Sequence, residues 1–391
     1  MVNFNFYAPT EVIFGANKEN SVADLIKFYG GKKVLLIYGK NSIEKSGLLK
    51  KVCKILRESN IKFTSLKGVQ ANPLISKVEE GIKIGIKENV DFILAIGGGS
   101  VIDSAKAIAV GIKSDSKIED LIGRKDISKA LPVGVILTIA AAGSEMSQTS
   151  VLTNDQTKLK RSFKGRAMRP KFAILNPELT YTLSNYQSAC GIADIIMHTI
   201  ERYFSKAKTL DITDAFSAKF VENVMNNAFI VLKENDNYKA RAEIMWCGSL
   251  AHNDILSTKN QRGDWACHQL GHELSAKYGI AHGASLTAVW PTWARYVYSY
   301  DKERFLKFAK EVMQVKKGGS DEDIILKGIE KLENFFKEIK LPTSQSELNI
   351  EISDEDLEDM VIKASRFDSF KPGNIKELNK KDIKTIFQKA I

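Results

Sequence analysis

The chain has 391 residues, which is long enough for two domains, and its 44% hydrophobic and 27% charged residues are typical of a folded globular protein. No apolar run reaches the roughly 18 residues of a membrane span, and the N-terminus lacks the layout of a secretory signal. The formal net charge of +10 comes from lysines interleaved with acids, which favours a solvated surface over nucleic-acid binding. The four cysteines have no paired spacing, as in a reducing compartment. We therefore expect a cytoplasmic protein that binds neither membranes nor nucleic acid.

The first half of the chain alternates short apolar runs with helical segments. Four continuous apolar runs bounded by Gly, Pro or Asn indicate buried strands at residues 32–39, 91–98, 132–139 and 171–176. Two intervening segments place apolar residues at helical spacing, with charged residues on the opposite face, at 42–59 and 76–89. Strands separated by helices predict a parallel sheet that is covered by helices on both faces.

The pattern changes between residues 178 and 190, and from there to the end the segments show helical periodicity without a convincing strand. The sequence therefore predicts a Rossmann-like α/β domain over residues 1–183, which would bind a dinucleotide. An all-helical, metal-binding domain is expected over residues 184–391.

A glycine-rich turn follows the second predicted strand in the run "ILAIGGGSVIDSAKAIA", residues 93–109. Gly97, Gly98 and Gly99 let the backbone approach a ligand closely, and a helix starting at Ser100 would present free N–H groups to a phosphate. The run is not the Gly-x-Gly-x-x-Gly fingerprint, so a tight turn without a ligand is the alternative. A second loop, "AAAGSE", follows the next strand and contains Ser144. Two such loops at strand ends favour a nucleotide site.

The first predicted strand ends in "YGKNS". An enzyme that uses NADH usually has an acid here to accept hydrogen bonds from the ribose hydroxyls. Gly39, Lys40, Asn41 and Ser42 offer donors and no acid, which favours NADPH over NADH. A plain surface turn with the same residues is the alternative.

Three of the five histidines lie in "HQLGHELSAKYGIAHG". His268 and His272 are four residues apart and would share one helix face, while His282 follows a Tyr-Gly break that would fold the chain back toward them. A zinc peptidase would need a glutamate directly after the first histidine as general base. Gln269 stands there, which argues against a metal hydrolase.

A second pair with the same spacing, Asp194 and His198, occurs in "ADIIMHTIERYF". One carboxylate combined with imidazoles suits Fe²⁺ or Zn²⁺. A local helix pair or a buried core histidine is the alternative at each position. Because four of the five histidines fall in these two patterns, the sequence favours a metal site.

The whole chain resembles the iron-containing (group III) alcohol dehydrogenases, and within them the branch of NADPH-dependent butanol dehydrogenases and broad aldehyde reductases. The matching segments are "NFNFYAPTEVIFG", "GVQANP", "GGGSVIDSAKAIA", "GSE", "NPELTYTL", "ADIIMHTIERYF", "DWACHQLGHELSA" and "AHG". The resemblance implies that the metal ligands are Asp194, His198, His268 and His282. It places His272 near the nicotinamide and the substrate, a distinction from His268 that spacing alone does not make.

The resemblance also implies the cofactor contacts. They are Gly97, Gly98, Gly99 and Ser100 for the diphosphate, Gly39, Lys40, Asn41 and Ser42 for the 2′-phosphate, and Asp103, Ser144 and Lys160 elsewhere on the cofactor. Lys40 and Asn41 replace two glycines of this branch, and Ala142 stands where the family usually has a threonine.

The activity that the resemblance implies is reversible hydride transfer between NADP(H) and short- to medium-chain aldehydes such as butanal. A divalent ion would stabilise the negative charge that develops on the substrate oxygen. His272 would either relay a proton or only pack against the nicotinamide. The resemblance implies a homodimer. The alternatives are a dehydroquinate synthase-like or glycerol dehydrogenase-like enzyme of the same superfamily, and a nucleotide-binding scaffold without catalysis.

Overall fold

A computed structural model describes residues 4–206, 210–256, 263–316 and 319–390. The chain forms two compact units. The sheet unit consists of Ala8–Leu183 and Asp236–Asn253, and the helical unit contains Ser184–Asn235 and Asp254–Ile391 together with Met1–Tyr7. The division of the chain into functional domains at residue 183 stays a prediction, and helix α9 (Tyr238–Ala251) lies in the sheet unit although it comes from the second half of the sequence.

The sheet unit is built on a six-stranded parallel sheet with the order β1-β8-β5-β4-β2-β3. Its strands are β1 (Glu11–Phe14), β2 (Lys33–Tyr38), β3 (Lys62–Lys67), β4 (Phe92–Gly97), β5 (Val133–Leu137) and β8 (Phe172–Leu175). The four strands expected from apolar runs are β2, β4, β5 and β8, so the prediction of a parallel sheet is confirmed. The two edge strands, β1 and β3, were not expected because they are half-exposed and lack a continuous apolar run.

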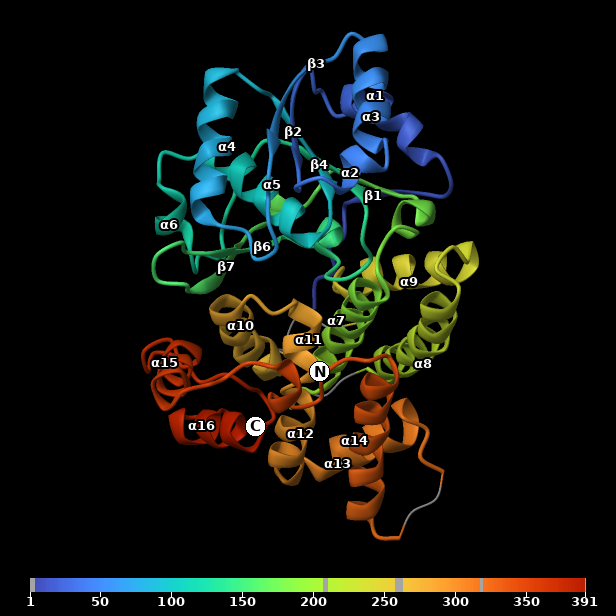
Figure 1. Ribbon diagram of the computed structural model, residues 1–391, viewed down its shortest axis with the longest axis vertical. Coiled ribbons are helices and arrows are strands. Elements are labelled where there is room, and N and C mark those ends of the chain that lie inside the picture. Colours follow the sequence, from blue (N-terminus) through green and yellow to red (C-terminus); the bar gives the residue numbers. More distant parts are fainter. Residues whose placement is uncertain (1–3, 207–209, 257–262, 317–318, 391) are drawn as a thin grey trace. The chain divides into compact units, whose positions relative to one another are not determined.

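Helices cover both faces of this sheet (Figure 1). One face carries α1 (Val22–Phe28) and α3 (Leu48–Glu58), whose apolar side chains join those of β2, β4 and β8 in one buried cluster. The other carries α4 (Ile75–Lys87) and α5 (Gly99–Gly111), which pack against each other. The segment with helical spacing over 42–59 forms two helices, because Gly47 has a φ of 78° and separates α2 (Ser42–Lys45) from α3.

The sheet unit is completed by a small antiparallel hairpin and by several short helices. These are β6 (Thr149–Thr153), β7 (Lys160–Lys164), α6 (Ile118–Leu121), η1 (Lys18–Ser21), η2 (Ser144–Met146), η3 (Arg166–Met168) and η4 (Pro177–Thr180). Helix α9 is tied to this unit by Trp246, whose ring meets that of Phe14 edge-on, and by Ser249, which donates a hydrogen bond to Glu145 at 2.6 Å.

The helical unit contains no strand among its described residues, as the sequence predicts. Its helices are α7 (Asn185–Tyr203), α8 (Asp211–Lys233), α10 (Ala266–Tyr278), α11 (His282–Thr287), α12 (Trp290–Val297), α13 (Lys302–Lys307), α14 (Asp321–Glu338), α15 (Asp354–Ala364) and α16 (Lys380–Lys389), with short turns at η5 (Tyr298–Tyr300), η6 (Phe308–Val312) and η7 (Ser346–Leu348). Helix α7 begins with a capping box at Ser184 and is buried from Ser188 to its end. Trp290 and Trp293 are fully buried and pack among phenylalanine rings, so both are core residues.

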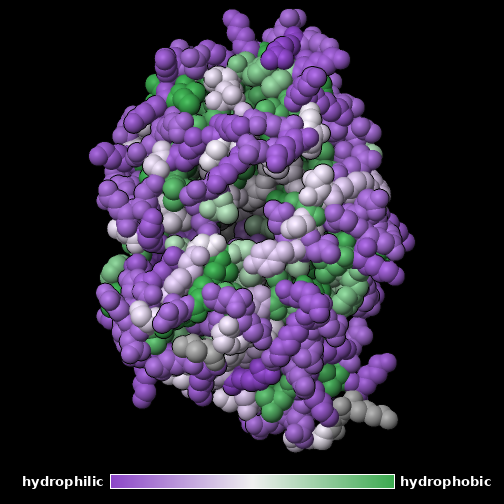
Figure 2. Space-filling model, viewed as in Figure 1, coloured by the Kyte–Doolittle hydropathy of each residue, from purple (hydrophilic) through white to green (hydrophobic). Residues whose placement is uncertain are grey.

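The surface view in Figure 2 shows mainly hydrophilic side chains with scattered apolar ones. In the described ranges, no helix has the length and apolar character needed to cross a bilayer. All four cysteines are free thiols.

Candidate metal centre and cofactor loops

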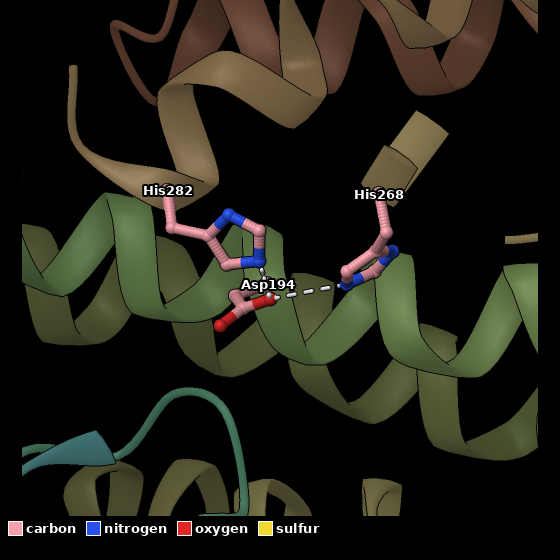
Figure 3. Close-up of side chains that lie close together, drawn as sticks. All are labelled: Asp194, His268 and His282. Carbon is pink, nitrogen blue, oxygen red and sulfur yellow. Dashed lines mark ion pairs between the residues drawn. The ribbon is translucent and has the colours of Figure 1, made fainter. Parts of the chain in front are cut away.

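Three of the four predicted metal ligands, all histidines, converge on one oxygen of the fourth, Asp194. Its Oδ1 lies 3.8 Å from Nδ1 of His198, 3.7 Å from Nε2 of His268 and 3.7 Å from Nε2 of His282. The ligand atoms of Asp194, His268 and His282 all lie within 4.8 Å of one another (Figure 3). His198 is not in that group of three, but its ring stacks on His268 with centroids 4.7 Å apart. Helices α7, α10 and α11 thus bring all four side chains to one place.

Close helix packing sets this geometry. A Cβ atom added at Gly283 would lie 2.1 Å from the carbonyl oxygen of Cys190 on α7, so only glycine lets α11 approach α7 so closely. Gly271 on α10 also lies close to α11, because a Cβ there would make a tight contact of 3.0 Å with Oγ of Ser285. Ser275 also donates a hydrogen bond of 2.9 Å to Ser285. The three helices are therefore fixed against each other beside the ligands.

The chemistry of the donor set fits a divalent cation. The side chains of Asp194 and His268 are only 5% and 6% exposed, and that of His282 is 24% exposed. Nε2 of His268 has no hydrogen-bond partner among the residues that the structure describes. A buried polar atom without a partner is costly, but a cation bound at about 2.1 Å from each donor would satisfy both the imidazole nitrogen and the carboxylate oxygen, because such donors lie about 3–4 Å apart.

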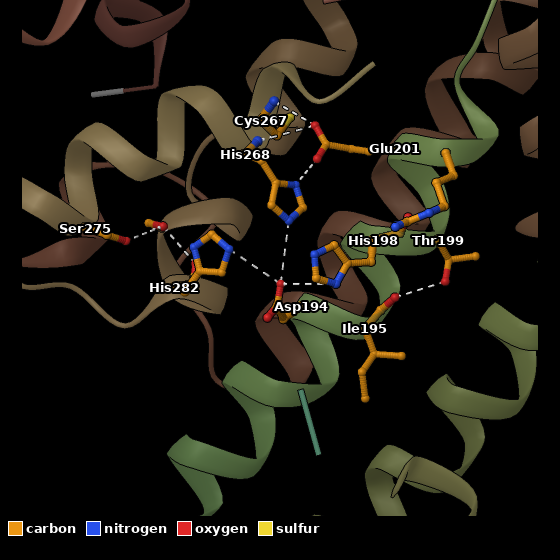
Figure 4. Close-up of polar contacts among 11 residues, drawn as sticks. Asp194, Ile195, His198, Thr199, Glu201, Cys267, His268, Ser275 and His282 are labelled. Carbon is orange, nitrogen blue, oxygen red and sulfur yellow. Dashed lines mark hydrogen bonds and ion pairs between the residues drawn. The ribbon is translucent and has the colours of Figure 1, made fainter. Parts of the chain in front are cut away.

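A buried carboxylate that the sequence analysis did not select, Glu201, contacts Nδ1 of His268 (Figure 4). Burial lowers the pKa of His268, but Glu201 and Asp194 outweigh this effect and raise the pKa to about 9. Glu201 follows Asp194 and His198 on the same face of α7, at the i, i+4, i+7 spacing. Extending the Asp-His pattern by one more turn could have found it.

Two further side chains border the metal centre. Arg202 donates a hydrogen bond of 2.9 Å to the carbonyl oxygen of His198, and its guanidinium lies 4.6 Å from the ring centroid of Trp265. Trp265 is half-buried and has a φ of 59°, and its ring centroid is 5.1 Å from that of His268. Trp265 therefore lies beside the centre, whereas Trp290 and Trp293 lie in the core.

His272 lies next to the ligands without joining the group of three. Its ring centroid is 5.3 Å from that of His282 and 6.3 Å from that of His268. Helix α10 places it one turn beyond His268. The position of His272 agrees with a place beside the metal, and its role in catalysis stays a prediction.

The glycine-rich turn lies where β4 passes into α5. A Cβ atom at Gly98 would be 2.1 Å from Cγ2 of Ile139, and one at Gly97 would be 2.6 Å from Cγ2 of Val101, so internal packing requires both glycines. At Gly99 the added atom would make only an ordinary contact, 3.4 Å from Cβ of Ala142. The turn therefore brings the start of α5 close to the loop that follows β5, and the first turn of a helix offers free N–H groups.

Asp103 and Ser144, both predicted to serve the cofactor, are bonded to each other. Oγ of Ser144 donates to Oδ1 of Asp103 at 2.5 Å and accepts from Nζ of Lys106 at 2.8 Å. Lys106 is completely buried and also donates to the carbonyl oxygen of Thr149 at 2.9 Å. Burial lowers the pKa of Lys106 to about 8, opposed by Asp103 and Glu145. Lys106 was not predicted as a site residue, although a lysine within the apolar stretch of α5 was a signal.

The other predicted cofactor residues lie at two separate places in the sheet unit. Lys160 begins β7, is 6% exposed and donates a hydrogen bond of 2.9 Å to Oδ1 of Asn72. Lys40 and Asn41 are exposed after β2, and Ser42, also exposed, begins α2. Glu44 in α2 is paired with Nζ of Lys67 at 2.7 Å.

A parallel sheet with a glycine-rich turn, together with a buried carboxylate and histidine cluster, defines a nucleotide- and metal-dependent class of enzyme. The chain belongs to the iron-containing alcohol dehydrogenase family. Residues 9–177 match the model described as iron-containing alcohol dehydrogenase, and residues 188–391 match the model of the C-terminal part of that family. The predicted family is thereby confirmed.

Relatives span the full chain. The chain is 37% identical over 394 residues to NADH-dependent butanol dehydrogenase A of Clostridium acetobutylicum, covering 100% of both proteins. It is 32% identical over 355 residues to the NADPH-dependent aldehyde reductase YqhD of Escherichia coli, covering 90% of each. The crystal structure of NADH-dependent butanol dehydrogenase A from Thermotoga maritima superposes with a TM-score of 0.94 at 36% identity, covering 100% of this chain and 99% of that one.

Proposed function

We propose that this member of the family is a metal-dependent alcohol dehydrogenase and aldehyde reductase that transfers hydride reversibly between NADPH and short- to medium-chain aldehydes such as butanal. The observation that carries the proposal is the convergence of three imidazoles on the buried carboxylate of Asp194. The relatives named butanol dehydrogenase and aldehyde reductase support the substrate class.

Each proposed site residue has a distinct role in this reaction. Asp194, His198, His268 and His282 would hold the divalent ion, Fe²⁺ or Zn²⁺, because both ions accept one carboxylate and several imidazoles. When bound, the ion supplies the positive charge that stabilises the oxygen of the substrate as it becomes an alkoxide. His272, next to His282, would move a proton toward that oxygen or pack against the nicotinamide.

The cofactor contacts belong to the same proposal. They are Gly97, Gly98, Gly99 and Ser100 for the diphosphate, with Asp103, Ser144 and Lys160 for the rest of the cofactor. The hydrogen bond between Ser144 and Asp103 supports a shared role, since it joins the start of α5 to the loop after β5.

The preference for NADPH rests on the turn after β2. Gly39, Lys40, Asn41 and Ser42 present no carboxylate that would repel a 2′-phosphate. Glu44, the acid that follows in α2, has its charge paired with Lys67. The names of the relatives include both cofactors, because the Clostridium protein is called NADH-dependent and the E. coli protein NADPH-dependent.

The cofactor proposal is tested by steady-state kinetics with butanal and each cofactor. We expect a higher kcat/KM with NADPH than with NADH, and we expect Lys40→Glu to lower the ratio of the two. A wild-type enzyme with a higher kcat/KM for NADH would overturn this part of the proposal. The proposal also includes a homodimer and a cytoplasmic location. The family resemblance supports the homodimer, and the four free thiols support the location.

A further inference from the structure

Glu201 is a buried carboxylate of the helical unit that contacts both the start of α10 and the ring of His268. Its side chain is completely buried on α7, one turn beyond His198. Oε1 accepts a hydrogen bond of 2.8 Å from the backbone N–H of Cys267, in the first turn of α10. Oε2 contacts Nδ1 of the His268 ring, as Figure 4 shows. Both carboxylate oxygens are therefore committed to the segment that carries one predicted metal ligand.

The first contact fixes where α10 begins. The N–H groups in the first turn of a helix have no partner within the helix and carry partial positive charge. A carboxylate at that position is stabilised by this charge and satisfies a donor that is buried with Cys267. Glu201 thus attaches the start of α10 to α7, the helix that also carries Asp194.

The second contact fixes the ring of His268. A neutral imidazole has one N–H and one nitrogen lone pair, and an acceptor on one nitrogen decides which nitrogen holds the proton. With Glu201 as the acceptor, the single hydrogen of the neutral ring lies on Nδ1, and Nε2 has the lone pair. Nε2 is the nitrogen that lies 3.7 Å from Oδ1 of Asp194. In the neutral ring, the contact therefore directs the lone pair to the metal-facing nitrogen, and it holds the ring in place there.

We propose that Glu201 is a positioning residue of the metal centre: it holds His268 with its proton on Nδ1 and anchors the start of α10 on α7, so that the affinity for the divalent ion depends on it. The inference rests on the proposed function, because it assumes that the cluster around Asp194 binds a metal.

The substitution Glu201→Gln separates this role from simple space filling. Glutamine has nearly the same volume, but its amide has a single acceptor oxygen, whereas two N–H groups, of Cys267 and of the His268 ring, require acceptors here. In the variant either the helix start or the ring loses its acceptor. Carboxylates that orient metal-bound histidines typically change metal affinity by about 10- to 100-fold when they are mutated.

Thr199→Val provides a matched control. Thr199 is also fully buried on α7 and donates a hydrogen bond of 3.0 Å to the carbonyl oxygen of Ile195, without a hydrogen bond to a metal ligand. Valine keeps the shape and removes that bond. Glu201→Asp adds a second comparison, since it keeps the charge and both oxygens on a side chain that is one methylene shorter.

The test is a titration of the metal-free full-length protein with Co²⁺ in competition with a chromophoric chelator, together with the visible absorption bands of the bound Co²⁺. We expect Glu201→Gln to raise the dissociation constant by about 10- to 100-fold and to shift the bands. Glu201→Asp should give a smaller loss of at least about threefold, and Thr199→Val should behave like the wild type. Circular dichroism and thermal melting establish that each variant is folded.

The possible results distinguish a failure of the proposed function from a failure of the proposed role of Glu201. A wild-type protein that binds no Co²⁺ at this centre would contradict the proposed function itself. Wild-type affinity and unchanged bands in Glu201→Gln would overturn the role of Glu201 alone, as would an equal loss in Thr199→Val. If Glu201→Gln does not fold, Glu201→Asp decides, and wild-type affinity and bands in that variant contradict the inference.

Discussion

The contact between α11 and α7 gives a sharp prediction, because a single methyl group should disturb the metal centre. In Gly283→Ala the new Cβ would start 2.1 Å from the carbonyl oxygen of Cys190. An ordinary contact between carbon and oxygen is more than 1 Å longer, at about 3.3 Å or more, so α11 must shift by about 1 Å. His282 directly precedes Gly283, whereas metal sites hold their bond lengths to within about 0.2 Å. Such overpacking costs about 1–3 kcal/mol of folding free energy.

The expected result is a large loss of metal content together with a fall in turnover of about 100-fold, the usual effect of a 1 Å displacement at a reacting centre. Metal analysis by mass spectrometry and aldehyde reduction measure the two effects. Gly328→Ala is the control, because its Cβ would lie 2.5 Å from Cβ of Ala309, where no metal ligand takes part. It should lower the melting temperature and leave the metal content unchanged. A Gly283→Ala variant with wild-type metal content and turnover would refute the reasoning.

Three further predictions concern the proposed metal centre and the proposed cofactor loops. His268→Ala should lose the metal and the activity together, and retention of full metal content by mass spectrometry would remove His268 from the ligand set. In the metal-free protein, burial lowers the pKa of His268, but Glu201 and Asp194 raise it to about 9. Metal binding below that pH must then displace a proton, so the apparent metal dissociation constant should rise about tenfold for each unit that the pH falls, in chelator competition between about pH 6.5 and 8.5. Lys106→Met removes the bonds to Ser144 and Thr149. It should raise the KM for the cofactor by about tenfold, which corresponds to about 1.4 kcal/mol and lies within the range of about 1–3 kcal/mol for an unsatisfied buried polar group, while metal content stays constant.

Much of the fold could be predicted from apolar patterns. Strands β2, β4, β5 and β8 are buried on both faces, and each therefore appears in the sequence as an uninterrupted apolar run. The edge strands could not be found in this way, because β3 mixes exposed and half-buried residues with a single buried one, Leu66. Helix α9 is also instructive, since its periodicity was visible but its place in the sheet unit depends on contacts with Phe14 and Glu145, far away in the sequence.

The cluster proposed as the metal centre could be predicted because its residues obey local rules. Asp194 and His198 share a helix face, and so do His268 and His272. Spacing could not tell which of the last two lies against Asp194, because that depends on the bend before His282 and on the approach of α11 to α7. The residues that support the ligands were missed because a buried glutamate or lysine looks like a surface residue until its partners are known, and the partners of Lys106 lie about 40 residues away, at Ser144 and Thr149.

The central claim is that the cluster around Asp194 binds one divalent ion that the reaction requires. The most direct measurement follows the absorbance of NADPH on addition of butanal, before and after chelation and after addition of Fe²⁺ or Zn²⁺, with metal content determined for the same samples. The account predicts activity in the wild type, its loss with the metal, its return with the metal, and neither metal nor activity in Asp194→Ala. Undiminished NADPH consumption by protein shown to be free of metal would contradict the account.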